Sequence, residues 1–405
     1  MTDAPIDAGP GSFEGQPPAG DSASEYGRAW AEIDLNAIAN NVSVLKDTAS
    51  TAEVMAVVKA DAYGHGLIPS ARAAQRGGAS YLGVALLSEA IALREGGVEG
   101  PIFAWLPTPG DEFEKCIALD IELNVGASWM LTEIEQAARK LNTRARIHLK
   151  ADTGLGRGGT FLNSANSDSW ERLVAEVAQS QSEGLVEVVG IWTHLAWADS
   201  PFHGTIGNQH DNFVRAIEFA KAAGINPILR HAANSAATFA LPNMHFDLVR
   251  PGISVFGVSP GPEVGTSESL GIKPAMTLAA RLVQVKDLPA GSGVSYGHEY
   301  VTSRDTNVGL VPLGYADGIQ RAASSAGPVL AAGKVRTIAG RVCMDQFVIE
   351  LEGDLAQAGD TVTLFGPGLR GEPTATDWAD AIGTIPYEIV TCVGPRVPRV
   401  FVGGA

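Results

Sequence analysis

The sequence predicts an α/β protein in two parts: an N-terminal (β/α)8 barrel of the TIM type, followed by a C-terminal, mainly β domain. Three observations carry this prediction. Strand-like apolar runs alternate with helical periodicity along the first part of the chain. Polar residues cluster directly after those runs, where the active sites of barrel proteins form. Beyond about residue 260, helical periodicity becomes scarce and short strands broken by Gly, Pro and Asp follow.

Length, charge and cysteine content exclude several classes of protein. The chain has 405 residues, 45% of them hydrophobic, which suffices for a large core and more than one domain. A formal net charge of −16 argues against nucleic acid and membrane surfaces as partners, since both attract basic faces. Three scattered cysteines fit neither a disulfide framework nor a zinc site, and we expect no metal. Without a signal peptide or an apolar run of about 18 residues, the chain is expected in the cytoplasm.

The elements follow in order along the chain. Residues 1–28 are rich in Gly, Pro, Ser and acidic residues, which predicts a flexible acidic tail. The barrel is predicted over residues 29–260, and it opens with the strand "AWAEIDL" and the helix "NAIANNVSVLKDTA". Its later strands are "EVMAVVKA", "YLGVAL", "PIFAWL", "IELNVGA", "RARIHLKADTG", "EVVGIWTHLA", "ILRHAANSAA" and "FDLVRPGISVFG". About eight strand–helix units within about 230 residues fit a closed barrel better than an open sheet.

The C-terminal β domain is predicted over residues 261–405. Turn residues interrupt its apolar runs after a few positions, which is typical of short strands. Its expected strands lie in "AMTLAARLVQVKDL", "NVGLVPLG", "GKVRTIAGRVCMDQFVIEL" and "DTVTLFG".

The stretch "AVVKADAYGHG" places Lys59 at the end of a buried strand. A single lysine there is most simply a side chain that reaches solvent from the strand end. Its functional interpretation is a Schiff-base lysine, because desolvation lowers the pKa of an amine and makes it nucleophilic towards an aldehyde. Tyr63 follows among glycines that allow close approach of the backbone, and its hydroxyl is suited to donate to a phosphate.

Further polar residues follow the later barrel strands. Each has an ordinary structural explanation, such as a solvated loop, a structural histidine or a surface arginine. Together they would lie at one end of the barrel: Lys150, Arg157, His194, Asn234, Ser235 and Arg250. The Pro-Gly turn after Arg250 exposes backbone N–H groups suited to a phosphate. Pyridoxal 5'-phosphate explains this set, since it needs a lysine, a phosphate site and a partner for its ring nitrogen.

From about residue 29 onwards the chain resembles the alanine racemase family. The similarity rests on six motifs in the family's order: "VVKADAYGHG", "HLKADTGLGRGG", "HAANSAA", "VSYGHEY", "LGYADG" and "GRVCMDQ". The resemblance implies an isomerase, a pyridoxal-phosphate-dependent racemase that interconverts L-alanine and D-alanine and supplies D-alanine for peptidoglycan. It also implies a head-to-tail homodimer with shared active sites.

The resemblance further implies a role for each matching residue. Lys59 and Tyr296 would be the two catalytic bases, with Tyr296 supplied by the partner subunit. The residues expected at the cofactor are Lys59, Tyr63, Arg157, His194, Asn234, Ser235, Arg250, Gly252 and Ile253. Those expected at the substrate are Arg157, Met344, Asp345 and Tyr315, the last in the access corridor. Lys150 matches a position that is often carbamylated in the family.

Two bases on opposite faces suit a reaction that removes a proton from one face of Cα and returns one to the other. Arg250 would face the pyridine nitrogen of the cofactor, and His194 would link Arg250 to Tyr296. A permanently charged arginine disfavours protonation of that nitrogen, which weakens the cofactor as an electron sink and should limit transamination.

Two positions depart from the family pattern. Pro395 stands where a tyrosine that reaches the phosphate is common, which implies either weaker phosphate binding or replacement by the nearby Tyr387. Phe256 stands where another tyrosine is common, which we interpret as a change in packing.

Three alternatives stay open at this point. A serine or broad-specificity amino-acid racemase would use the same fold and mechanism. A pyridoxal-phosphate decarboxylase would share the fold, but it would favour a carboxylate rather than Arg250 at the ring nitrogen. A non-catalytic cofactor carrier would need no second base, so "VSYGHEY" and "CMDQ" count against it.

Overall fold

The computed structural model describes residues 27–162 and 169–404. The predicted acidic tail, residues 1–28, lies outside the described residues except for its last two positions. Of the helices in the described ranges, none is both long enough and apolar enough to span a membrane.

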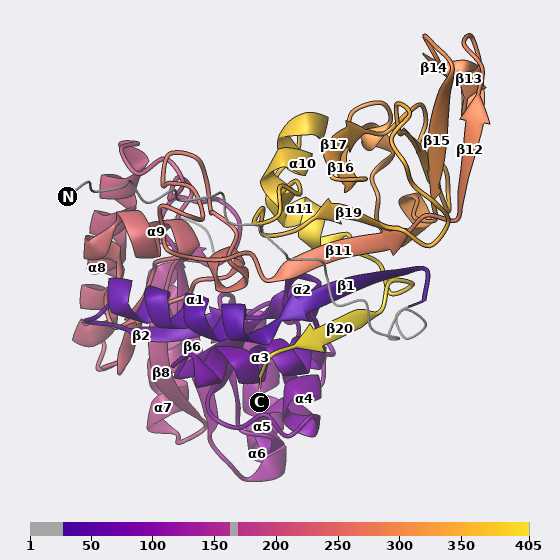
Figure 1. Cartoon of the computed structure of the whole chain (residues 1–405). Coiled ribbons are helices and arrows are strands. Elements are labelled where there is room, and N and C mark those ends of the chain that lie inside the picture. The colour runs from indigo at the N-terminus through magenta and orange to yellow at the C-terminus, as the bar shows by residue number, and fades with distance from the viewer. Residues whose placement is uncertain (1–26, 163–168, 405) are drawn as a thin grey trace, which may run out of the picture.

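Within the described residues, eight parallel strands form a nearly closed barrel (Figure 1). The strand order is β10-β2-β3-β4-β5-β6-β8-β9, with the short β7 (Thr160–Phe161) paired to β6. The barrel strands are β2 (Glu53–Val57), β3 (Tyr81–Val84), β4 (Ile102–Ala104), β5 (Ile121–Val125), β6 (Ala145–Asp152), β8 (Val186–Trp192), β9 (Leu229–His231) and β10 (Leu248–Val249). The two ends of this order, β10 and β9, are linked by two backbone hydrogen bonds next to these strands: Asp247 N–H to Arg230 O at 3.0 Å and Arg250 N–H to Ala233 O at 2.8 Å. The predicted barrel is confirmed.

Helices alternate with these strands and surround the barrel (Figure 1). Helix α1 (Leu35–Thr48) buries one apolar face, and Asp34 caps its N-terminus by accepting two backbone N–H hydrogen bonds. The others are α3 (Leu67–Arg76), α4 (Leu87–Glu95), α5 (Phe113–Ala118), α6 (Ser128–Leu141), α7 (Trp170–Ser182), α8 (Thr205–Ala222) and α9 (Ser235–Ala240). Short 3-10 turns follow: η2 (Pro242–Met244), η3 (Ile253–Phe256), η4 (Tyr296–His298), η5 (Tyr315–Asp317) and η6 (Arg321–Ala323).

The C-terminal part is mainly β, as predicted. A six-stranded sheet has the order β17-β16-β19-β11-β1-β20, and a three-stranded sheet has the order β12-β15-β18. The strands are β1 (Ala29–Asp34), β11 (Met276–Arg281), β12 (Gln284–Leu288), β13 (Gly293–Val294), β14 (Tyr300–Val301), β15 (Thr306–Val311), β16 (Pro328–Ala331), β17 (Lys334–Thr337), β18 (Phe347–Glu350), β19 (Thr361–Phe365) and β20 (Arg399–Val402). Strands β13 and β14 form a separate hairpin, and two helices, α10 (Ala375–Ile382) and α11 (Pro386–Thr391), complete this part.

Strand β1 pairs with the C-terminal sheet rather than with the barrel, although our predicted barrel range of 29–260 includes it. It runs antiparallel to β11, with Trp30 opposite Ala279, and parallel to β20, with Ile33 opposite Phe401. Its alternating buried and half-exposed residues are the same whichever sheet it joins, so the sequence pattern did not distinguish the two. The N-terminal strand therefore ties the two parts of the chain together.

Candidate active site

Lys59 opens a left-handed turn that follows strand β2. In this turn, α2 (Lys59–Tyr63), the four residues after the lysine have φ between 53° and 55°. Non-glycine residues in this conformation cost about 1–2 kcal/mol each, so surrounding contacts must hold the turn. Glu89 accepts a hydrogen bond from Ala60 N–H at 2.6 Å, and Asp61 accepts one from the first N–H of α3 at 2.7 Å. Strained backbone of this kind clusters at functional sites.

The Lys59 amine is half-buried, with Nζ 5.7 Å from the centroid of the Trp105 ring. Burial lowers its pKa, the positive charge of Arg157 lowers it further, and the carboxylate of Glu89 opposes both effects. A lowered pKa increases the fraction of neutral amine, which is the form able to attack a carbonyl or accept a proton.

Arg250 is buried just after β10, and its guanidinium is held from several sides. One terminal nitrogen donates to Thr193 O at 2.7 Å and to Ala232 O at 3.1 Å, and the other lies 3.1 Å from His231 Nδ1. Burial lowers its pKa to about 9, so the group stays charged at neutral pH. Among the described residues no acceptor meets the Nε–H, which leaves this donor available to a ligand.

Lys150 and His194 lie near Arg250. Lys150 Nζ lies 4.3 Å from the centroid of the Trp192 ring, and burial, then Arg157 and Arg250, lowers its pKa to about 8. His194 Nδ1 lies 3.5 Å from an Arg250 nitrogen, at the long end of the hydrogen-bond range. Burial, followed by the nearby cations, lowers the pKa of His194 well below its usual value. His194 is therefore neutral at pH 7 and accepts from Arg250, which leaves its other ring nitrogen to donate.

Tyr63, Ser235 and Gly252 meet at the start of turn η3. A β-carbon on Gly252 would lie 2.2 Å from the Tyr63 hydroxyl, so the two residues are in close contact. Ser235 Oγ accepts hydrogen bonds from Gly252 N–H at 2.8 Å and from Ser254 N–H at 3.4 Å, on either side of Ile253. Burial raises the pKa of Tyr63, so its hydroxyl remains a donor. Hydroxyl and backbone N–H donors gathered in this way can bind an anion.

Local hydrogen bonds to the backbone position Asn234 and the loop that carries Arg157. Asn234 Oδ1 accepts from Ala237 N–H at 3.0 Å and caps helix α9. The loop that carries Arg157 is organised by Asp152, whose carboxylate accepts four backbone N–H hydrogen bonds at 2.9 to 3.2 Å. The Arg157 side chain is exposed, and its charge acts on both Lys59 and Lys150.

Four of the predicted site residues lie in the C-terminal part of the chain: Tyr296, Tyr315, Met344 and Asp345. Tyr296 begins η4, between β13 and β14, and its side chain is 72% exposed. Figure 1 shows this hairpin at the tip of the C-terminal part, far from the barrel strands. A single chain therefore does not bring Tyr296 to Lys59.

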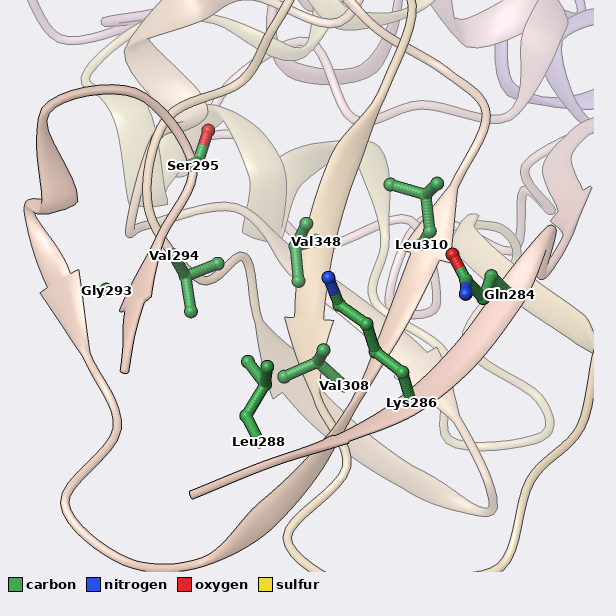
Figure 2. A pocket seen from close by; sticks show the side chains of 9 residues that line it. All are labelled: Gln284, Lys286, Leu288, Gly293, Val294, Ser295, Val308, Leu310 and Val348. Carbon is green, nitrogen blue, oxygen red and sulfur yellow. The ribbon is translucent and has the colours of Figure 1, made fainter. Parts of the chain in front are cut away.

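Contacts between their chain neighbours join these four residues into a second surface group. Tyr315 N–H donates to Cys343 O at 3.0 Å, which connects "LGYADG" to "CMDQ", and Ser295 Oγ, next to Tyr296, lies 3.4 Å from Cys343 Sγ. Ser295, the neighbour of Tyr296, lines a small pocket whose other lining residues come mainly from β12, β15 and β18 (Figure 2). None of the side chains that line this pocket was predicted for the site.

The structure shows what surrounds Pro395 and Phe256, the two departures from the family pattern. Pro395 is exposed and offers no hydroxyl. The Tyr387 ring lies 6.4 Å from the Tyr63 ring between centroids, and burial raises the pKa of Tyr387. Phe256 is fully buried and its ring stacks on His65 at 4.4 Å, as expected of a packing residue.

Sequence reasoning missed several residues that shape the barrel interior. Trp192, His148 and His231 stand inside quoted motifs but were not singled out, and Glu122 and Asn124 alternate along an otherwise apolar strand. That alternation was the available signal, because residues two apart on a strand share one face. In residues 27–162 and 169–404, no group of three or more His, Cys, Asp or Glu side chains is arranged to hold a metal ion.

Comparisons with known proteins cover most of the chain. The family sequence models "Alanine racemase, N-terminal domain" and "Alanine racemase, C-terminal domain" match residues 33–260 and 275–401. A curated alanine racemase of Frankia casuarinae is 53% identical over 384 residues, which cover 95% of this chain and 99% of the relative. The solved alanine racemase of D-cycloserine-producing Streptomyces lavendulae matches with a TM-score of 0.91 and 53% identity, covering 93% of this chain and 98% of that chain. The alanine racemase of Bacillus anthracis with bound L-Ala-P matches with a TM-score of 0.83 and 34% identity, covering 93% of this chain and 95% of that chain.

Proposed function

The chain belongs to the alanine racemase family of pyridoxal-phosphate-dependent isomerases, and we propose that it interconverts L-alanine and D-alanine with Lys59 and Tyr296 as its two bases. The observation that carries this proposal is the desolvated Lys59 amine on its strained turn, whose charge, like that of the buried Arg250, acts on His194. We propose further that the protein works in the cytoplasm and that its D-alanine serves peptidoglycan synthesis.

The residues at the barrel mouth fit pyridoxal 5'-phosphate. The hydroxyls of Tyr63 and Ser235 and the backbone N–H groups of Gly252 and Ile253 would hold the phosphate, with the Gly252 N–H shared between Ser235 Oγ and a phosphate oxygen. The free Nε–H of Arg250 would meet the ring nitrogen. When bound, the cofactor draws electron density from the amino acid and so makes its Cα proton acidic.

The remaining charged residues would surround the phenolic oxygen and the substrate. Arg157 would face that oxygen and the substrate carboxylate, and Asn234 and His194 would border the cofactor. Lys150, with its pKa lowered to about 8, presents enough neutral amine near pH 7 to react with carbon dioxide. The resulting carbamate would place an anion beside Arg157.

Lys59 has the properties of a base for one face of the substrate. Its lowered pKa supplies the neutral amine that can take the Cα proton, and the same amine in its charged form can return a proton. Arg250 has a pKa of about 9 and therefore keeps its proton at neutral pH, so it donates a hydrogen bond without transferring charge. Arg250 would therefore leave the ring nitrogen of a bound cofactor unprotonated, which would disfavour transamination.

The second base would come from another copy of the chain. Tyr296 is exposed and distant from the barrel of its own chain, and Tyr315, Met344 and Asp345 belong to the same surface group. A head-to-tail homodimer would bring this group over the partner's Lys59 and complete two sites at once. In each site Lys59 would act on one face of Cα and Tyr296 of the partner subunit on the other, with His194 linking Tyr296 to Arg250.

Racemisation assays on the holoenzyme test the proposed reaction. We expect wild-type protein to convert L-alanine to D-alanine faster than it racemises serine or lysine, and Lys59→Ala to lose both activity and the visible absorption of the lysine-bound cofactor. No racemisation of alanine by cofactor-loaded wild-type protein would overturn the proposed function. A clear preference for serine would change the substrate, and release of carbon dioxide from a basic amino acid would indicate a decarboxylase instead.

Mixing two inactive variants tests the shared site. Lys59→Ala and Tyr296→Phe chains, unfolded and refolded together, would form mixed dimers in which one site combines an intact Lys59 with an intact Tyr296. Because half of the dimers would be mixed and each would hold one intact site of two, activity should return to about one quarter of wild type. Refolding either variant alone is the control, and mixtures that stay inactive would contradict the shared site.

A further inference from the structure

A row of hydrogen-bonded side chains crosses the inside of the barrel from Arg250. His231 Nδ1 lies 3.1 Å from an Arg250 nitrogen, and His231 Nε2 lies 2.9 Å from His148 Nδ1. His148 Nε2 lies 2.7 Å from one carboxylate oxygen of Glu122. The other carboxylate oxygen is 2.5 Å from a terminal nitrogen of Arg146, near the N-terminal ends of the strands. We call Arg250, His231, His148 and Glu122 the barrel relay.

The barrel relay is closed off from solvent and tightly packed. His148 and His231 are fully buried, and Glu122 is 1% exposed. The Phe103 ring lies 4.3 Å from the His148 ring and 5.9 Å from the His231 ring. On the neighbouring strand, a β-carbon at Gly190 would lie 2.3 Å from His148 Nδ1, so only glycine leaves room for this ring.

The donors and acceptors of the relay fit one arrangement of protons. Arginine has only donors, so His231 must accept at Nδ1 and, being neutral, must carry its proton on Nε2. Burial first, and then the charge of Arg250, lowers the pKa of His231 well below its usual value, in agreement with a neutral ring. His231 Nε2–H then donates to His148 Nδ1, which places the His148 proton on Nε2, facing the Glu122 carboxylate. The arginine at one end, which only donates, and the carboxylate at the other, which only accepts, thus require the same direction for every hydrogen bond in the row.

Arg250 is a buried cation, and the direction of these hydrogen bonds decides whether His231 offers it an acceptor. Its hydrogen-bond partners among the described residues are backbone carbonyls and imidazoles, with no carboxylate in direct contact. A buried cation without a well-placed acceptor is strongly disfavoured. Glu122, two imidazoles away, is the anion joined to it through the row. The reaction proposed above makes no use of His231, His148 or Glu122.

We propose that Glu122 and His148 are positioning residues for the racemase reaction: acting through His231, they hold the Arg250 guanidinium in the orientation that offers its Nε–H to the cofactor ring. This inference rests on the proposed function. If Glu122 is replaced by an amide, the side chain can donate to His148 Nε2, and every hydrogen bond in the row can reverse. An N–H of His231 would then face an N–H of Arg250, and the guanidinium would move or lose its fixed orientation.

The test compares Glu122→Gln with Glu187→Gln. Glu187 is a half-exposed carboxylate at the start of β8 that pairs with Arg144 at 3.5 Å and takes no part in the relay. For Glu122→Gln we expect the dissociation constant of pyridoxal 5'-phosphate from refolded apoprotein to rise about tenfold, the size of losing one hydrogen bond to a charged group. The holoenzyme should also release more pyruvate per alanine racemised, since a loosened Arg250 no longer keeps the ring nitrogen unprotonated. Glu187→Gln should match wild type in both measurements.

The outcomes separate a positioning role from a merely structural one. A Glu122→Gln protein with a lower unfolding temperature but wild-type cofactor affinity and pyruvate ratio would overturn the proposal. Should this variant fail to fold, Arg146→Gln removes only the partly exposed partner of Glu122, and a change in the same direction is expected. A folded Arg146→Gln protein with neither change would also overturn the proposal. Failure of the proposed function is a distinct result, because wild type itself would then not racemise alanine.

Discussion

The hydroxyl of Tyr63 lies against the backbone of Gly252, where a β-carbon would come within 2.2 Å of the phenolic oxygen. The φ of Gly252 is −114°, a value open to any residue, so close contact rather than backbone strain requires glycine here. The N–H of the same residue donates to Ser235 Oγ at 2.8 Å. Gly252 therefore sets the spacing between the hydroxyl and N–H donors of the proposed phosphate site.

Gly252→Ala should weaken cofactor binding. The added methyl group must displace the Tyr63 hydroxyl, and losing one hydrogen bond to a charged phosphate lowers affinity about tenfold or more. The measurement is the dissociation constant of pyridoxal 5'-phosphate, from the change in visible absorption on titrating the apoprotein. Gly207→Ala is the control, because a β-carbon at this helical position meets no atom within 4 Å. Equal affinities for the two variants would argue against Tyr63 and Gly252 as a phosphate site.

Tyr296→Phe should remove one of the two bases and leave the fold intact. Tyr296 is exposed on its own chain, so its hydroxyl contributes little to stability there. We expect racemisation to fall by about 10²–10⁴-fold, the usual contribution of a positioned acid or base. Cofactor absorption should stay unchanged, and Cα–H exchange with deuterated water should persist for only one alanine enantiomer. Tyr300→Phe, in the same hairpin, is the control, and equal loss of exchange from both enantiomers would contradict the assignment of faces.

The barrel and its ring of strand-end residues could be read from the sequence because both depend on local patterns. Lys59 and Arg250 each follow an apolar run, and parallel strands that close into a barrel place such residues at one end. The sequence pattern could not show which of the two sheets β1 joins. Ala29, Ala31 and Ile33 alternate with half-exposed or exposed residues in a manner that suits either sheet.

The barrel interior and the lysine turn depended on contacts between distant segments. Glu122 and His148 come from different strands, and their hydrogen bond to one another is a property of the closed barrel. The left-handed turn after Lys59 is formed by two alanines, an aspartate and a tyrosine, and of these only the aspartate is a residue type enriched at positive φ. It is held by Glu89 from a later helix, so no local rule predicts it.

Lys150 should make stability depend on pH in a defined window. Burial first, followed by two arginines, lowers its pKa from 10.5 to about 8. Between pH 8 and pH 10.5 the unfolded chain binds a proton that the folded chain does not, so the free energy of unfolding rises with pH. Below pH 8 both states bind the proton, and the loss of stability caused by burying the charged amine is complete. Lys150→Met removes the buried charge and should raise the free energy of unfolding below pH 8 by up to about 3 kcal/mol. This gain should disappear as the pH approaches 10.5.

Denaturant unfolding in carbonate-free buffer at pH 7 and at pH 10 measures this difference. Carbonate is excluded because carbamylation would replace the amine. Lys140→Met, at an exposed lysine paired with Glu114, is the control and should show no such dependence. A gain for Lys150→Met that is the same at both pH values would mean that the pKa of Lys150 is not lowered.

Ala60→Gly should reverse the usual effect of placing glycine in a helical segment. Ala60 has a φ of 53°, which glycine adopts freely and alanine adopts at about 1–2 kcal/mol. Glycine also gains more entropy in the unfolded chain, by roughly 0.5–1 kcal/mol. We therefore expect the free energy of unfolding to stay unchanged or to rise by about 1 kcal/mol.

The matched change Ala92→Gly, inside the ordinary helix α4, should lower the free energy of unfolding by about 1 kcal/mol. Because both variants make the same chemical change, their difference in denaturant unfolding reports the backbone conformation directly. Equal destabilisation by the two would contradict the left-handed turn beside Lys59.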